Sequence, residues 1–194
     1  MSTSAPTTPM SFDAFLAWAE GRSERYELVE GTPVLMAPER AGHARMKARV
    51  HRALAEAIES AGADCEAFVD GMTVQVDDQN AYEPDVVVQC GPRLPDDAVV
   101  VEAPLIVVEV LSRSTQGRDA GAKLDDYFRI PSVMHYLMVK TDRFGVIHHA
   151  RRADGTILTR ILGEGLLHLD PPGLSLDIGA LSAQHSDAAG VDPG

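Results

Sequence analysis

One carboxylate stands inside the most apolar stretch of this chain, and it limits what the surrounding sequence can form. Residues 105–111 read Leu-Ile-Val-Val-Glu-Val-Leu, and Glu109 is the one polar residue among them. A β-rich run without alternation predicts a strand covered on both faces, so Glu109 should be largely buried. A buried ionised carboxylate costs several kcal/mol unless a cation, a metal or hydrogen-bond donors compensate it. We therefore expect a charged partner beside Glu109.

Two further segments supply candidate partners. Asp85 leads directly into a second apolar run, 86–88, and Lys123 lies in a predicted helix over 117–129. Asp85 and Glu109 are expected at one end of neighbouring strands, with Lys123 on the helix that packs back on the sheet. Two carboxylates and a lysine in this arrangement suit Mg²⁺ or Mn²⁺, which prefer oxygen ligands, and an anionic substrate.

Each of these residues also has a purely structural interpretation. Asp85 could be a turn residue at the start of its strand, and Glu109 could belong to an ion pair with no further role. Lys123 could pair with Asp119 at the i, i+4 spacing of a helix. The spacing alone leaves both interpretations open.

The remaining pattern predicts an α/β (α+β) fold in which helices flank a mixed sheet. Helices are expected over 12–20, 42–61 and 117–129, and strands over 26–29, 33–36, 65–69, 72–76, 85–89, 105–111, 133–139, 145–150, 156–162 and 166–169. Asp70-Gly71 predicts a hairpin between the third and fourth strands. One domain is expected over 11–181, with disordered tails over 1–10 and 182–194.

The predicted helix over 42–61 begins with a concentration of basic side chains. They are Arg45, Lys47, Arg49, His51 and Arg52, and His43 precedes them. A solvated face is one interpretation, and an anion-facing patch is the other. His43 opens this helix close to the first predicted pair of strands, where it is a candidate to line a site.

Composition restricts the setting in which the chain acts. The formal net charge of −12 argues against broad adhesion to nucleic acid, although local basic patches and bound divalent ions can offset it. No apolar run approaches the roughly 18 residues that span a bilayer, and the first ten residues do not resemble a secretory signal. Cys65 and Cys90 match no zinc or redox spacing, so free core thiols in a reducing cytoplasm are expected.

Several common catalytic motifs do not fit. The glycines before Lys123 are one residue too closely spaced for a phosphate-binding loop, and no Ser or Thr follows the lysine. The chain has no GxSxG elbow and no His-Glu-x-x-His helix. Ser112 is interpreted as a loop or capping residue, with substrate contact as the alternative.

An ordered series of motifs carries a resemblance to a known family. The series is Glu27-Leu28-Val29-Glu30-Gly31, His43, Pro84-Asp85-Val86-Val87-Val88, Val108-Glu109-Val110-Leu111-Ser112 with Ser114-Thr115, and Asp119, Lys123 and Tyr127. From about Tyr26 to Val139 the chain resembles the Uma-type restriction-endonuclease-like family of the PD-(D/E)XK superfamily. The resemblance implies a restriction-endonuclease-like core, a divalent metal and hydrolysis of nucleic-acid phosphodiester bonds.

The resemblance also assigns roles to individual residues. Asp85 takes the place of the first aspartate, Glu109 that of the second acid, and the backbone carbonyl of Val110 is expected to face the metal. Leu111 stands where a lysine is usual, so Lys123 resembles a lysine relocated to the next helix. An additional upstream acid would be Glu27 or Glu30, and Glu27 fits the pattern better.

The resemblance leads to one expected function and leaves one alternative. The expected function is a cytoplasmic endonuclease that depends on Mg²⁺ or Mn²⁺ and acts on nucleic acid, with DNA as the expected substrate. A homodimer is also expected, because two cuts in a duplex favour twofold symmetry. The alternative is a catalytically inactive module of the same fold that acts through protein partners, which the acidic charge favours.

Overall fold

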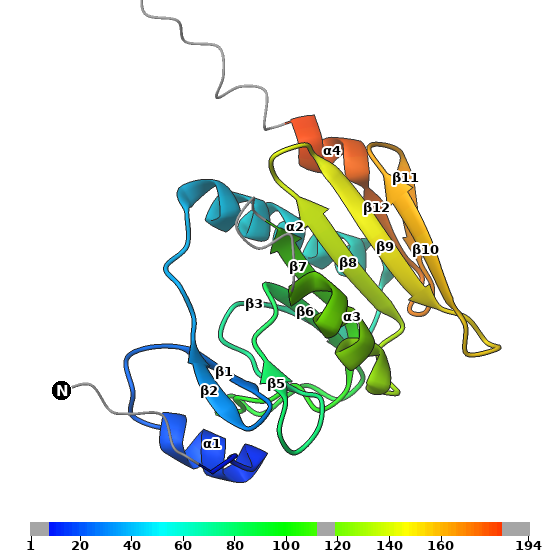
Figure 1. Ribbon diagram of the computed structural model, residues 1–194. Helices are drawn as coiled ribbons and strands as arrows, with labels where there is room; N and C mark the ends of the chain where they lie inside the picture. Colours follow the sequence, from blue (N-terminus) through cyan, green and yellow to red (C-terminus); the bar gives the residue numbers. More distant parts are fainter. Residues whose placement is uncertain (1–7, 112–118, 184–194) are drawn as a thin grey trace, which may run out of the picture.

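The computed structural model describes residues 8–111 and 119–183 and shows a six-stranded sheet with helices on both faces (Figure 1). The helices are α1 (Phe12–Ala19), α2 (Ala41–Ala61), α3 (Asp119–Arg129) and α4 (Ile178–Ala183). The strands are β1 (Tyr26–Val29), β2 (Thr32–Leu35), β3 (Cys65–Val69), β4 (Val74–Gln75), β5 (Ala81–Tyr82), β6 (Val86–Cys90), β7 (Pro104–Leu111), β8 (His135–Lys140), β9 (Gly145–Arg151), β10 (Ile157–Leu162), β11 (Leu166–Leu169) and β12 (Leu174–Asp177).

The main sheet is mixed, as the sequence predicts, and β7 lies inside it. Its strand order is β10-β9-β8-β7-β6-β3, in which β7 and β8 are parallel and the other neighbours are antiparallel. Side chains alternate between the two faces of a strand, so Val108 and Val110 face one layer while Val107 and Glu109 face the other. Because apolar groups cover both faces, β7 needs an apolar residue at nearly every position.

One face of the main sheet is covered by α2, α4 and the β11–β12 hairpin. Met46, Val50 and Leu54 recur every four residues along α2 and are fully buried against this face. Gly62 ends the helix in the left-handed conformation, with φ of 59°. Within the described part of the chain, no helix combines the length and apolar character needed to cross a membrane.

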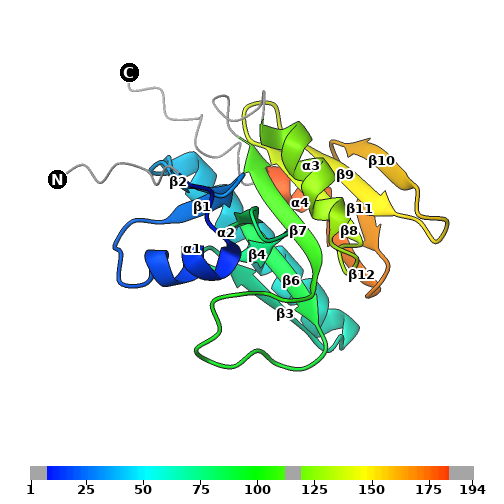
Figure 2. The same ribbon diagram turned by 60° about the horizontal axis from the view of Figure 1, so that its bottom comes forward.

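The other face of the main sheet carries α3 and the smaller sheet, which has the order β2-β1-β5-β4 (Figure 2). Phe12 and Phe15 of α1 pack against Leu28 of this smaller sheet. Ser11 caps α1 through a 3.3 Å bond from the Ala14 N–H to its hydroxyl oxygen, as its place before the apolar run predicts. The smaller sheet brings β1, which carries Glu27, close to the ends of β6 and β7.

The hairpin predicted between β3 and β4 is wrong. β3 pairs with β6 in the main sheet, and β4 pairs with β5 in the smaller sheet, so the chain leaves one sheet at Asp70-Gly71 and joins the other. Both residues have positive φ, as a tight hairpin turn also requires, but the side chain of Asp70 bonds Arg25 and Lys47. The sequence therefore predicts the turn at Asp70-Gly71 correctly, but it predicts the wrong partners for β3 and β4.

The expected tails are shorter than predicted where the structure describes them. Met10 donates a 2.7 Å hydrogen bond to the carbonyl of Gly31, and a Cβ at Gly31 would lie 2.5 Å from the Cβ of Pro9. Ser182 belongs to α4, which the sequence pattern did not predict, and neither β5 nor β12 was predicted. Residues 1–7 and 184–194 of the expected tails lie outside the described residues.

The expectation of free cysteines is also wrong. Cys65 on β3 and Cys90 on β6 stand directly opposite each other and form a disulfide. Sequence spacing could not show this pairing, because it arises from the antiparallel register of two strands whose connection passes through the other sheet. The disulfide joins an edge strand of the main sheet to the strand that follows Asp85.

Candidate active site

Asp85 and Glu109 lie at the same end of two adjacent strands, as the sequence predicts. Val86 pairs with Val108, so the antiparallel register continued by one residue places Asp85 opposite Glu109. The Val110 N–H donates a 2.6 Å hydrogen bond to Oδ2 of Asp85, which fixes that carboxylate at the edge of β7. Asp85 is 9% exposed, and the Glu109 side chain is 13% exposed.

Glu109 has the cationic partner that its burial predicts. The ammonium of Lys123, on α3, lies 3.1 Å from Oε1 of Glu109 and 2.8 Å from Oε1 of Glu27. The hydroxyl of Tyr127, one turn later on α3, donates a 2.9 Å hydrogen bond to the same oxygen of Glu109. The ammonium of Lys123 also lies 4.9 Å from the centre of the Tyr82 ring on β5, whereas the side chain of Asp119, its predicted local partner, lies outside the described side chains.

The protonation of this group follows from burial and from an excess of acids. Burial raises the pKa of Glu109 to about 7, although the Lys123 ammonium opposes the shift, and nearby Asp85 and Glu27 add to it. Burial alone would lower the pKa of Lys123, but Glu109 and Glu27 outweigh it, so the net pKa of this ammonium rises. Lys123 is therefore a permanent cation at neutral pH, shared between two carboxylates.

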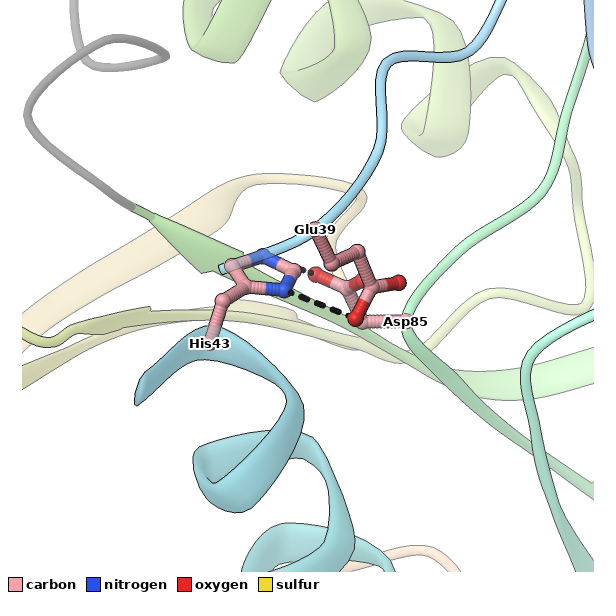
Figure 3. A group of neighbouring side chains, drawn as sticks. All are labelled: Glu39, His43 and Asp85. Atoms are coloured by element: carbon pink, nitrogen blue, oxygen red, sulfur yellow. Dashed lines mark ion pairs between the residues drawn. The ribbon is translucent and has the colours of Figure 1, made fainter. Parts of the chain in front are cut away.

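A second group meets Asp85 from the side of α2 (Figure 3). Glu39 precedes α2, His43 lies in its first turn, and one ligand atom from each of Glu39, His43 and Asp85 falls within 4.8 Å of the others. Nε2 of His43 is 2.7 Å from the carbonyl oxygen of Val110 and 3.4 Å from Oδ2 of Asp85. Nδ1 of His43 is buried, forms no hydrogen bond with the residues that the structure describes, and lies 3.5 Å from Oε2 of Glu39.

The Asp85 carboxylate raises the pKa of His43 to about 9, against the opposing effect of burial. An imidazolium therefore points at both Asp85 and the Val110 carbonyl in the metal-free protein at neutral pH. The family resemblance predicts that a divalent metal contacts these same two oxygens. The structure thus shows that the oxygen of Val110 and the carboxylate of Asp85 converge on one cationic group.

Lys47 is the buried residue of this site that sequence reasoning missed. Its side chain is 2% exposed, and its ammonium bonds Glu39, reaches Oδ1 of Asp70 at 2.6 Å and lies 3.7 Å from Oδ1 of Asp85. The signal that was present is the spacing of Glu39, His43 and Lys47, which recur every four residues where the long helix begins. The basic residues beside Lys47 instead favour a solvated position for it.

Carboxylates outnumber cations where these groups meet. The carboxylates are Glu27, Glu39, Asp70, Glu83, Asp85 and Glu109, and the cations are Arg25, His43, Lys47 and Lys123. With all six carboxylates ionised and His43 protonated, this part of the described structure carries an excess of two formal negative charges. A divalent cation would neutralise that excess, and carboxylate and carbonyl oxygens are the ligands that Mg²⁺ and Mn²⁺ prefer.

The two candidate upstream acids differ in position. Glu27 accepts bonds from Lys123 and, at 3.2 Å, from the N–H of Glu83. Glu30 occupies the exposed turn after β1 with φ of 49°, away from the lysine. The geometry therefore favours Glu27 as the assisting acid. Ser112, the other candidate for substrate contact, lies outside the described residues.

The fold and these side chains define a class of nuclease-like α+β proteins with an acid–lysine cluster at one end of a mixed sheet. The family model described as "Uma2: Putative restriction endonuclease" matches residues 12–179. This chain belongs to that family.

Two relatives and one solved structure extend the comparison. The chain is 30% identical over 179 residues to the Synechocystis protein "Uncharacterized protein slr1290", covering 91% of this chain and 93% of the relative. It is 29% identical over 168 residues to "Uncharacterized protein sll1609" of the same organism, covering 84% and 94%. A crystal structure of a protein from Anabaena variabilis, described as "a putative nuclease belonging to DUF820", superposes on this chain with a TM-score of 0.71 and 16% sequence identity. The superposition covers 91% of this chain and 99% of the Anabaena chain. At that identity the likeness shows the fold.

Proposed function

We propose that this protein is a divalent-metal-dependent endonuclease that hydrolyses phosphodiester bonds of nucleic acid, with DNA as the expected substrate. The observation that carries the proposal is that Asp85, which precedes β6, Glu109 of β7 and Lys123 of α3 lie at one end of the sheet. An ion pair that served only stability would need one acid. Here each cation contacts two or three acids, and their excess charge is costly without a further cation.

The residues present fit Mg²⁺ or Mn²⁺. Asp85, Glu109 and the carbonyl oxygen of Val110 would hold the metal, and the Val110 and Asp85 oxygens already face a common cationic group, His43. When bound, such a metal supplies Lewis acidity and lowers the pKa of a coordinated water. Glu39 and His43 share Asp85 with this set and offer a second arrangement of ligands.

The residues of α3 and β1 have their own part in the proposed reaction. Because two carboxylates raise the pKa of Lys123, its ammonium would orient the attacking water and stabilise negative charge on the phosphate, and would not accept a proton. Glu27 would position this ammonium through its 2.8 Å contact. A homodimer, in which two such sites act on the two strands of a duplex, is part of the proposal.

The test is a calorimetric titration of Mg²⁺ and of Mn²⁺ into the wild-type protein and Asp85→Ala at low ionic strength, followed by cleavage assays on DNA and RNA. Asp96→Ala is the matched control, because it also removes one aspartate but at a side chain that is 95% exposed. We expect saturable metal binding and cleavage that disappear in Asp85→Ala and persist in Asp96→Ala.

Cleavage by Asp85→Ala or Lys123→Ala at the wild-type rate would overturn the proposal. Stable binding of a protein partner without metal-dependent cleavage would favour the inactive module.

A further inference from the structure

The buried ammonium of Lys47 lies where three carboxylates meet beside the candidate active site. The lysine side chain is 2% exposed, and the acids within ion-pair distance of its Nζ are Glu39, Asp70 and Asp85. Burial alone would lower the pKa of Lys47, but its hydrogen bonds to Asp70 and Glu39 outweigh this effect, so the pKa rises. A permanent cation therefore fills the space between these three acids, the Lys47 position.

The two oxygens of Asp85 face two different cations. Oδ2 lies 3.4 Å from Nε2 of His43 (Figure 3), and the same nitrogen also contacts the Val110 carbonyl. Oδ1 lies 3.7 Å from Nζ of Lys47. The carboxylate of Asp85 thus serves two cation positions, one on each oxygen. Sites that bind two divalent ions about 3.5–4 Å apart commonly share a carboxylate in this way.

Lys47 is one of the cations that offset the acids of this site. The described structure has six carboxylates and four cations here when His43 is protonated, so without Lys47 the formal excess of negative charge would rise from two to three. Such an excess is costly for carboxylates that are partly or fully removed from water. Carboxylate oxygens are also the ligands that Mg²⁺ and Mn²⁺ prefer, so a divalent ion would suit the Lys47 position if the lysine were absent.

We propose that Lys47 occupies the second of two cation positions on Asp85, so that the site takes one divalent metal ion where it would otherwise take two. The inference rests on the proposed metal-dependent function, because it states how many ions that site binds. Since Lys47 is buried, it does not reach a substrate and acts through Asp85. It is a positioning residue, whose ammonium restrains Oδ1 of Asp85 while the Val110 N–H bonds Oδ2.

The test counts the Mn²⁺ ions that bind to the wild-type protein and to Lys47→Met, by calorimetry and by electron paramagnetic resonance. Methionine keeps an unbranched side chain and a similar helix propensity but removes the charge. We expect one ion per chain in wild type and two in Lys47→Met. Two Mn²⁺ ions that share a carboxylate couple magnetically, so the resolved hyperfine pattern of an isolated ion should be lost in the saturated variant.

Two further variants separate the Lys47 position from a general loss of positive charge. Arg25→Met also takes a cation from Asp70, but the other ion pair of Arg25 is with Glu83, so this variant should bind one ion. Lys47→Met/Asp70→Asn removes an acid together with the lysine and should also bind one ion, because the Lys47 position has lost a ligand. Asparagine tolerates the positive φ of residue 70.

Folding of each variant is monitored by urea unfolding in EDTA. Lys47→Met leaves three acids without their shared cation, so it is the variant most exposed to a loss of stability. If it is unfolded in EDTA, Mn²⁺ should restore its fold, because an ion that binds the folded state alone stabilises that state.

The outcomes separate this inference from the proposed function. One ion in both wild type and Lys47→Met, or two ions in wild type, would overturn the inference and leave a metal-dependent function standing. No ion in wild type but one in Lys47→Met would support the role of Lys47 and overturn the metal-dependent function. A second ion in Arg25→Met, or a Lys47→Met protein that stays unfolded at saturating Mn²⁺, would overturn the inference. Binding of no ion by either wild type or Lys47→Met would overturn both.

Discussion

The hydroxyl of Tyr127 and the ammonium of Lys123 both bond Oε1 of Glu109, at 2.9 and 3.1 Å. Within the described residues, Oε2 of Glu109 receives no hydrogen bond. Tyr127 is fully buried, and its ring lies 5.7 Å from that of Tyr82 and 5.1 Å from that of Tyr136. Two side chains one turn apart on α3 therefore orient one acid of β7.

Tyr127→Phe is expected to lower the free energy of unfolding by about 1–2 kcal/mol, because Glu109 loses a buried hydrogen bond while the ring packing remains. Urea denaturation measures this change. Calorimetry should also show weaker Mn²⁺ binding, since the carboxylate is less firmly oriented. Tyr26→Phe is the control, because the Tyr26 hydroxyl forms no hydrogen bond within the described part of the chain. Equal stability and metal affinity in wild type and Tyr127→Phe would contradict the orienting role.

His43 predicts a loss of stability at alkaline pH in the metal-free protein. Asp85 raises the folded-state pKa of His43 from 6.5 to about 9, so the folded protein retains a proton that the unfolded chain releases. The stabilisation is complete below pH 6.5 and is lost as the pH rises through 9. We expect the difference in unfolding free energy between wild type and His43→Gln to shrink by about 2 kcal/mol across this window, in EDTA. A difference that stays constant from pH 6 to 9.5 would show that the ion pair is absent in solution.

A buried histidine pair predicts the opposite response at acid pH. Nδ1 of His135 and Nε2 of His148 are 3.0 Å apart and share one proton, while Nε2 of His135 donates to the carbonyl of Pro171 at 2.9 Å. Burial, with a smaller contribution from His135, lowers the pKa of His148 from 6.5 to about 4. The stability that this pair contributes is therefore present above pH 6.5 and lost as the pH falls toward 4.

His148→Gln should remove that acid response, because glutamine does not titrate. Urea midpoints from pH 7.5 to 4.5 should fall more steeply for wild type than for the variant, by up to about 3 kcal/mol in unfolding free energy over the range. His168→Gln, at an exposed histidine that contacts Ser175, is the control and should follow wild type. Parallel curves for wild type and His148→Gln would exclude the histidine pair as the cause.

The sequence predicts those parts of the site whose positions follow from the pattern of apolar residues within one strand or one helix. An unbroken apolar run identifies β7 and makes the burial of Glu109 unavoidable, and the order of segments brings Asp85 beside it. Lys123 follows from the amphipathic pattern of α3, whose buried face turns toward the same strand. These inferences require only the pairing of β6 with β7 and the orientation of α3, and the burial of apolar side chains determines both.

The parts that the sequence does not predict depend on pairing between distant segments. The positive-φ turn at Asp70-Gly71 forms as its residues dictate, yet tertiary pairing sends β3 to one sheet and β4 to the other. Lys47 has the sequence context of a solvated helix residue, and its burial follows from Asp70 and Asp85, which arrive from elsewhere in the chain. A helical pattern alone cannot distinguish such a lysine from its exposed neighbours.

The disulfide predicts a measurable stabilisation under oxidising conditions. Cys65 and Cys90 are separated by 25 residues, and closing a loop of that length restricts the unfolded chain by about 3.5 kcal/mol in the chain-entropy description. Reduction, or the Cys65→Ser/Cys90→Ser variant, should lower the free energy of unfolding by up to that amount. The variant should show no further response to a reductant. A wild-type protein whose unfolding is identical with and without reductant would show that the bond does not form in solution.

The last prediction decides which ligands hold the metal. Asp85 belongs both to the proposed ligand set with Glu109 and the Val110 carbonyl and to the candidate group with Glu39 and His43. In the proposed arrangement, Glu109→Gln should weaken Mn²⁺ binding by about tenfold or more in calorimetry, since an anionic ligand becomes neutral, while Glu39→Gln should change it much less. The reverse order would place the metal between Glu39 and His43. A destabilised Glu109→Gln protein with wild-type metal affinity would instead assign Glu109 to a structural ion pair with Lys123.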